Sequence, residues 1–127
     1  MLNKKTILLT ALTLLLLQAT NATTEYWNTP EDCVIDADQT DTDKTIIYTC
    51  DIIVNNSATW NLENVILKSN QTENWQYNIQ IKDATVNFNR VSFISQNDKM
   101  TSHSHTSESI VSFVRCDIPY PQRWNPV

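Results

Sequence analysis

The stretch "ATWNLENVILKS" (residues 58–69) returns 26 positions later as "ATVNFNRVSFIS" (residues 84–95). Five of the twelve positions are identical, and the apolar positions coincide. In each copy two apolar residues alternate with polar ones, a two-residue break follows ("EN" or "NR"), and two more apolar residues alternate again. This period of two predicts β-strands whose apolar side chains face one side of a sheet.

A third and weaker copy, "VSFVRCDI" (residues 111–118), follows 25 positions after the second. Short apolar segments, "DIIV" (residues 51–54) and "NIQI" (residues 78–81), precede the first two copies, whereas the polar "TSHSHTSES" (residues 101–109) precedes the third and indicates a longer loop. One such unit cannot bury its apolar face, but stacked units share a core. The repeat therefore predicts an all-β solenoid.

Stacked copies bring equivalent positions into columns along the solenoid. Two columns of inward side chains are predicted: Trp60, Val86 and Val111 form one, and Leu62, Phe88 and Phe113 form the other. Cys116 falls in the column of Val65 and Val91, so we expect a free, buried thiol that packs as a small hydrophobic residue.

The repeated strands and their two-residue breaks resemble the right-handed parallel β-helix proteins, the pectate-lyase-like superfamily and its surface-protein relatives. The resemblance covers roughly residues 45–118 and implies a short right-handed parallel β-helix of about three to four rungs. In that family an Asn in the left-handed conformation often forms a sharp turn, and Asn64 and Asn89 are placed to do so. A small β-sandwich with Asn turns fits the same alternation and is the alternative fold.

The N-terminus indicates export. "MLNKK" is followed by the apolar "TILLTALTLLLL" and by small residues near Ala22, the order of a secretory signal peptide. An uncleaved N-terminal anchor is the alternative, although the apolar part is short for a membrane span. We therefore expect a chain that is secreted or displayed on the cell surface. The expected division is a signal peptide (1–22), an acidic N-terminal cap or linker (23–44), solenoid repeats (45–118) and a Pro-rich C-terminal tail (119–127).

The mature chain is acidic. Cleavage removes two of the nine Lys and Arg residues and leaves seven against fourteen Asp and Glu, a net charge of −7. Such a surface repels phosphate backbones and anionic lipids, which argues against nucleic acid and membrane surfaces as partners. No later segment approaches the ~18 apolar residues of a spanning helix, so no membrane span is expected after signal cleavage.

Three cysteines in an oxidising compartment leave one unpaired. We expect a disulfide between Cys33 and Cys50, which lie close in sequence and bracket an acidic segment, with Cys116 left over. Asn55 in "NNS" and Asn70 in "NQT" match the acceptor pattern for N-glycosylation.

Two clusters could hold a metal ion. The acidic stretch "DADQTDTD" offers Asp36, Asp38, Asp41 and Asp43 as candidate calcium ligands, with a solvated acidic loop as the alternative. It does not fit an EF-hand, because its sixth position is not Gly and its twelfth is not Glu. His103 and His105 share one face of an extended chain, but a third ligand is missing nearby, so a flexible loop is favoured over a metal site.

The resemblance also implies polysaccharide lyases with an Arg or Lys base, or hydrolases with clustered Asp residues. Arg90 and Arg115 fall in one column, but Asp83 and Asp117 fall in different ones. The catalytic motifs of the superfamily therefore match no residue here, and we expect no enzyme and no cofactor.

The sequence predicts a secreted or cell-surface, non-catalytic structural or interaction module, either a finished small domain or a fragment of a larger β-helix surface protein. Its expected partner is an extracellular protein or a glycan. Trp75 and Tyr77 are a candidate platform for stacking sugar rings, with packing over the solenoid as the alternative. A degenerate pectate-lyase-like enzyme and a small glycan-binding β-sandwich are the competing functions.

Overall fold

The computed structural model describes residues 23–118 and 122–126. The predicted signal peptide (residues 1–22) lies outside the described residues, as do residues 119–121 and 127 of the Pro-rich tail. Among the described residues, no helix is long and apolar enough to cross a membrane.

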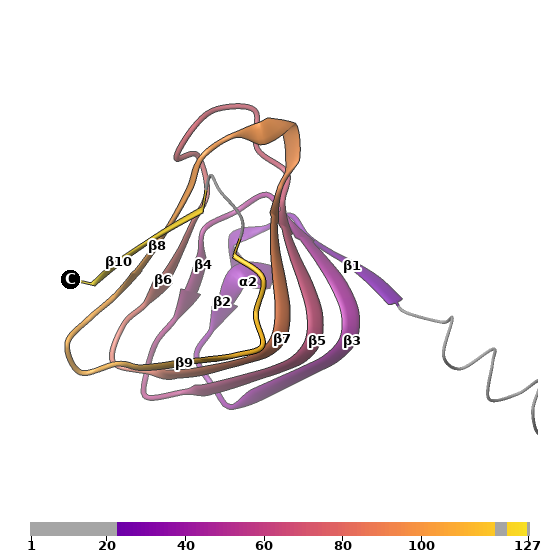
Figure 1. Cartoon of the computed structure of the whole chain (residues 1–127). Helices are drawn as coiled ribbons and strands as arrows, with labels where there is room; N and C mark the ends of the chain where they lie inside the picture. The colour runs from indigo at the N-terminus through magenta and orange to yellow at the C-terminus, as the bar shows by residue number, and fades with distance from the viewer. Residues whose placement is uncertain (1–22, 119–121, 127) are drawn as a thin grey trace, which may run out of the picture.

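The chain is a parallel β-solenoid of about four turns, in which strands of one sheet alternate along the sequence with strands of a second sheet. Figure 1 shows the two sheets facing each other across the interior. Sheet A contains, in spatial order, β1 (Thr23–Trp27), β3 (Gln39–Tyr48), β5 (Thr59–Ser69), β7 (Thr85–Ser95) and β9 (Ile110–Val114). Sheet B contains β2 (Val34–Ile35), β4 (Ile52–Val54), β6 (Asn78–Ile81), β8 (Thr101–His105) and β10 (Gln122–Pro126). A short helix, α2 (Pro30–Cys33), and a 3-10 turn, η1 (Gln96–Asp98), complete the elements.

The strand register confirms the columns that the repeat predicts. Trp60 pairs with Val86, which pairs with Val111 on its other side. Leu62, Phe88 and Phe113 pair in the same way. Every strand pair described is parallel, which excludes the alternative of a β-sandwich, since sandwiches are built from antiparallel sheets.

The long strands of sheet A bend in the middle, at a residue in the left-handed conformation. The prediction for Asn64 is confirmed, because its φ is 54°. The prediction for Asn89 is wrong: the register pairs Asn89 with Glu63, so the position equivalent to Asn64 is Arg90, whose φ is also 54°. In a chain without glycine, left-handed positions fall on Asn, but also on Asp, Ser, Trp and Arg: Asp43, Asn56, Ser57, Asn64, Trp75, Asp83, Arg90, Asn97 and Arg115.

The solenoid is longer than the repeat indicates. β1 pairs with β3 from Thr23 onward, and β3 pairs with β5 from Gln39, so strand pairing begins before the expected boundary at residue 45. The predicted long loop at residues 101–109 is wrong in its first half, because β8 pairs with β6 there. Part of the expected tail forms β10, which pairs with β8.

Aromatic side chains fill the interior between the sheets. Trp60 and Phe88 are completely buried. The ring centroid of Trp60 lies 5.9 Å from that of Trp27 and 6.3 Å from that of Phe88, and Phe88 stacks on Phe113 at 5.0 Å. The contacts of Phe88 join neighbouring coils, and the contact between Trp27 and Trp60 reaches from β1 past β3 to β5, so the core is continuous along the solenoid axis.

The N-terminal end of the solenoid is closed by α2. Thr29 and Asp32 form a capping box, in which each side chain accepts a hydrogen bond from the other residue's backbone N–H. Cys33, at the end of α2, is fully buried and forms the predicted disulfide with Cys50, with 6.2 Å between the Cα atoms. The disulfide therefore ties α2 to the turn that follows β3.

Replacing both Cys33 and Cys50 by alanine is expected to lower the free energy of unfolding by roughly 3 kcal/mol, because the unfolded chain regains the entropy of a loop of this length. Equilibrium urea denaturation of the oxidised protein and of the double variant measures the difference. Either single replacement should cost about as much as the double one, since each removes the same bond. A double variant as stable as the parent would contradict a structural role for the disulfide.

Candidate functional site

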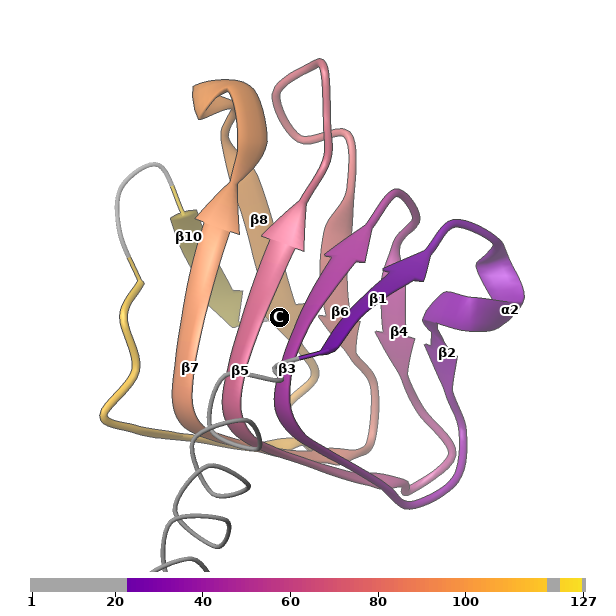
Figure 2. The same ribbon diagram turned by 90° about the vertical axis from the view of Figure 1, so that its right-hand side faces the viewer.

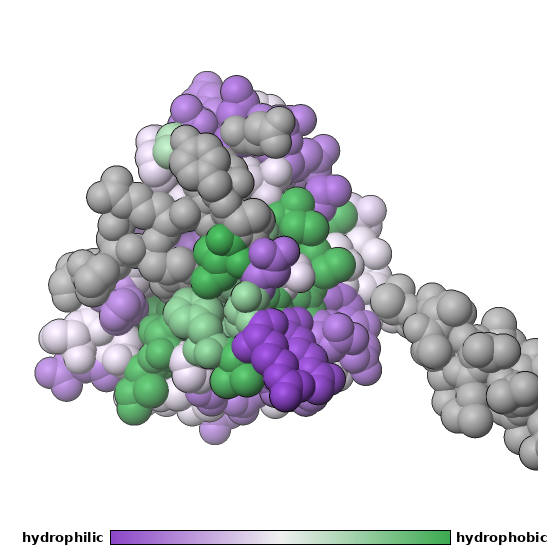
Figure 3. Space-filling view, in the orientation of Figure 1, coloured by the Kyte–Doolittle hydropathy of each residue, from purple (hydrophilic) through white to green (hydrophobic). Residues whose placement is uncertain are grey.

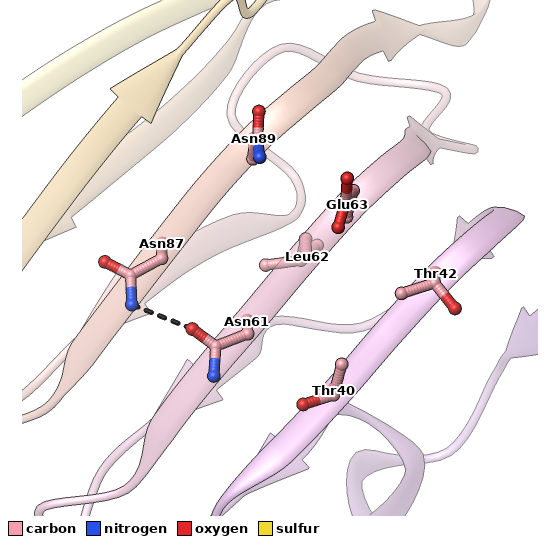
Figure 4. A pocket seen from close by; sticks show the side chains of 7 residues that line it. All are labelled: Thr40, Thr42, Asn61, Leu62, Glu63, Asn87 and Asn89. Atoms are coloured by element: carbon pink, nitrogen blue, oxygen red, sulfur yellow. Dashed lines mark hydrogen bonds between the residues drawn. The ribbon is translucent and has the colours of Figure 1, made fainter.

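A row of polar side chains covers the outer face of sheet A, in the half of each strand before the bend. Trp60, Leu62 and their equivalents point inward, so the residues between them point outward. We call these outward residues the outer polar face: Thr40 and Thr42 of β3, Asn61 and Glu63 of β5, and Asn87 and Asn89 of β7. Together with Leu62 they line an open depression of about 200 Å³ (Figure 4).

Hydrogen bonds between coils fix the amides of the outer polar face. The hydroxyl of Ser112 donates to Oδ1 of Asn87 over 2.7 Å, and Nδ2 of Asn87 donates to Oδ1 of Asn61 over 2.8 Å. Figure 4 shows the amide nitrogen of Asn61 turned away from Asn87. The amides are therefore held in one orientation by their neighbours, which reduces the entropy lost when a ligand binds.

The outer polar face is nearly neutral. Of its lining residues only Glu63 is ionisable, and the others present amides, hydroxyls and the edge of one leucine. Hydrolysis of a glycoside by the usual route needs two carboxyl groups flanking the bond. The depression offers hydrogen-bond donors and acceptors, but it does not contain that pair.

The arginine column is confirmed by the register, but it lies at the bend. Arg90 and Arg115 are exposed and have positive φ values of 54° and 53°. Asp83 lies in the turn before β7, where its Oδ1 accepts a hydrogen bond from Thr106. The backbone of Asp117 pairs with β7. Asp83 thus precedes β7, whereas Asp117 pairs with Ser92 beyond the bend, so the two aspartates lie in different columns.

The four candidate calcium ligands have separate partners. Asp41 is buried and accepts hydrogen bonds from Nε1 of Trp60 at 2.7 Å, Nζ of Lys44 at 2.9 Å and Nε2 of Gln39 at 2.8 Å. Burial alone would raise the pKa of Asp41, but these hydrogen bonds outweigh it and lower the pKa.

The other three aspartates also lie apart. Asp38 accepts from the backbone of Thr59, Asp43 accepts from Asn64 at the bend, and Asp36 is exposed. Among residues 23–118 and 122–126, no three His, Cys, Asp or Glu side chains form a group that could hold a metal ion. The acidic segment stabilises the first coil rather than forming a converging set of ligands.

The two histidines share a face, as the sequence indicates, but that face is the interior. His103 is fully buried in the column of Ile52 and Ile79, and its ring lies 5.3 Å from that of Phe93. Burial lowers the pKa of His103 to about 3. His103 is therefore a neutral core residue at physiological pH.

The remaining predicted residues lie in different environments. Trp75 is 42% exposed in the loop after β5, whereas Tyr77 packs against the core, so only Trp75 presents an exposed ring. Asn70 is exposed, but Asn55 is half-buried with its Oδ1 shielded from solvent. Cys116 is unpaired as predicted, yet it is half-buried rather than buried, because it lies in the last coil of sheet A.

The outer polar face was missed in the sequence, although a signal exists. Asn61 and Asn87 are one of the five identities between the two copies, and each stands between two inward apolar residues. An identical polar residue at an outward position of a stacked repeat predicts a side-chain ladder on the surface.

These features define the chain as a parallel β-solenoid with an aromatic interior and a polar outer face. Comparisons with protein-family models, with curated proteins and with solved structures find no match. The solenoid fold is thus shown by strand pairing, whereas membership of the pectate-lyase-like superfamily is without support from these comparisons.

Proposed function

We propose that the protein is an extracellular, non-catalytic solenoid module that binds a neutral glycan along the outer polar face. The observation that supports this most directly is the hydrogen-bonded amide row from Ser112 through Asn87 to Asn61. Sugar hydroxyl groups both donate and accept hydrogen bonds, and amides and hydroxyls do the same. An extended glycan crossing the strands would meet equivalent side chains at each coil, roughly 4.8 Å apart.

The net charge supports a neutral ligand, and the disulfide supports an extracellular location. A mature chain with a net charge of −7 repels acidic polysaccharides, which favours a neutral ligand. The disulfide between Cys33 and Cys50 is typical of proteins outside the reducing cytosol. The proposed role is binding rather than cleavage, because the depression lacks a pair of carboxyl groups.

The proposal is tested by titrating isotope-labelled protein with β-1,4-linked hexasaccharides of glucose, xylose and N-acetylglucosamine. The side-chain amide signals of Asn61 and Asn87 should shift with at least one of them. Asn61→Ala and Asn87→Ala should each weaken that binding roughly fivefold, the effect of losing one hydrogen bond worth about 1 kcal/mol.

Gln80→Ala is the matched control, because Gln80 carries the same amide group on the outer side of sheet B. It should leave the affinity unchanged. Equal weakening by Gln80→Ala, or no binding of any neutral hexasaccharide, would contradict the proposed site. Shortened sugars after incubation would instead show catalysis and overturn the non-catalytic role.

A further inference from the structure

The two ends of the solenoid differ, and the end formed by β9 exposes apolar side chains. We call Val111, Phe113, Val114, Cys116 and Ile118 the β9 end face. Phe113 is 40% exposed, whereas Phe88, its equivalent one coil inward, is fully buried. Figure 3 looks onto this end and shows hydrophobic surface next to hydrophilic surface. The equivalent of a core residue is thus partly exposed in the last described coil of sheet A, and Val114, which pairs with the outward Asn89, adds a 50% exposed apolar side chain beside it. Val111 and Cys116 are half-buried and pack against the core.

The backbone of this end also faces outward. β9 is one of the two edge strands of sheet A, and β1 at the opposite end is the other. Residues 116–118 continue the β9 edge past the bend at Arg115. The N–H of Asp117 donates to the carbonyl of Val91, and its carbonyl accepts from the N–H of Phe93, both over 3.0 Å. Because backbone groups alternate in direction along a strand, those of Cys116 and Ile118 point away from β7. Such an edge offers hydrogen bonds to another strand.

The opposite end also has an edge strand, β1, but it does not offer the same apolar surface. There α2 lies at the end of the solenoid, beside β2 (Figure 2). Trp27 and Cys33 are buried, and the exposed residues include Glu31 and Asp32. A copy that approached through this acidic end would be repelled by the same end of its partner, and α2 would block stacking against β9. A second copy is therefore expected to meet the β9 end face with its own β9 end face.

We propose that the β9 end face binds a second copy of this chain about a two-fold axis, with the edge strands antiparallel. The charges around Cys116 are complementary in this arrangement. Arg115 precedes Cys116 and Asp117 follows it, and both are exposed. An antiparallel pairing centred on Cys116 sets Arg115 opposite Asp117 of the second copy, and the symmetry repeats the pair. The exposed apolar side chains of both copies then cover each other.

The test is sedimentation equilibrium of the purified chain over a wide concentration range, with the Cys33–Cys50 disulfide intact and with Cys116 replaced by serine in every sample, so that no disulfide can form between copies. A monomer–dimer equilibrium is expected. Arg115→Glu places a glutamate opposite Asp117 of the other copy, and the two-fold symmetry repeats this repulsion. The variant should therefore weaken the dimer at least about tenfold. Asp117→Arg should weaken it similarly, whereas the combined exchange Arg115→Asp with Asp117→Arg restores the pairing and should recover most of the affinity.

Arg90→Glu is the matched control, since Arg90 occupies the same bend one coil inward and is also exposed. It should leave the dimer unchanged, and thermal unfolding checks that every variant folds. A monomer at all concentrations, an open-ended series of larger assemblies, or a dimer insensitive to Arg115→Glu would overturn the proposal. So would equal weakening by Arg90→Glu.

Discussion

Replacing Trp60 by alanine is expected to lower the free energy of unfolding by about 3–5 kcal/mol, the usual cost of deleting a large buried aromatic side chain. Trp60 is completely buried and lies between Trp27 and Phe88, so the cavity opens where three coils meet. Its Nε1 also donates to the buried carboxylate of Asp41 over 2.7 Å. The variant therefore loses both packing and one hydrogen bond to a charge.

Urea denaturation followed by far-UV circular dichroism measures the loss. Trp60→Phe separates the two causes, because it keeps most of the packing and removes only the hydrogen bond, at an expected cost of about 1–3 kcal/mol. Tyr26→Ala is the control, since Tyr26 is an aromatic residue of sheet A that is 63% exposed. It should change the stability by less than about 0.5 kcal/mol. If Trp60→Ala lowered the free energy of unfolding by less than about 1 kcal/mol, the buried side chain of Trp60 would not be a main contributor to the core.

The core of the solenoid was predictable from two patterns: the period of two shows which side chains of a strand point inward, and the repeat shows which strands are stacked. Once residues 58–69 and 84–95 are aligned, each inward residue of one copy must stack on an inward residue of the next, and the observed register does so. The disulfide was predictable for a different reason, because two nearby cysteines in an exported chain have few other partners. Both predictions follow from local sequence.

The elements that escaped prediction depend on contacts between coils. β8 consists of Thr, Ser and His, so it has no apolar alternation, and it becomes a strand because β6 supplies a parallel edge in register. The left-handed bend falls on Arg90 rather than Asn89 because the register, not the intrinsic preference of the residue, decides which position turns. A preference of about 1–2 kcal/mol is too small to shift a strand, since a one-residue slip would expose every inward side chain.

The same physical reason explains why the candidate site was not found where the sequence suggested. Asp41 and His103 have residue types that suit metal binding, yet both are directed inward by the alternation of their strands. Asn61 and Asn87 are unremarkable as single residues, but stacking turns them into a fixed row. In a solenoid the direction of a side chain and its equivalent in the next coil are better guides to a site than residue type.

The stability of the protein is expected to fall by about 2 kcal/mol when the pH is lowered from 7 to 5, and His103 is expected to be the cause. Burial lowers the pKa of His103 to about 3, against an ordinary value of 6.5. Between these values the unfolded chain binds a proton that the folded chain does not bind, so the free energy of unfolding rises with pH. The stabilisation is complete above pH 6.5 and is lost progressively as the pH falls toward 3, at about 1.4 kcal/mol per unit.

Urea denaturation at pH 7, 6 and 5 tests this expectation on the parent chain and on His103→Ile. Isoleucine continues the column that Ile52 and Ile79 begin, so the variant keeps an apolar side chain in the interior and lacks the titrating group. Its stability should therefore change far less than that of the parent between pH 7 and 5. Asp41 does not confuse the comparison, because its pKa is lowered from 3.8 and its stabilisation is lost only below that pH. If His103→Ile kept the full dependence on pH, the buried, neutral His103 would not be its source, and another group that gains a proton on unfolding would have to be sought.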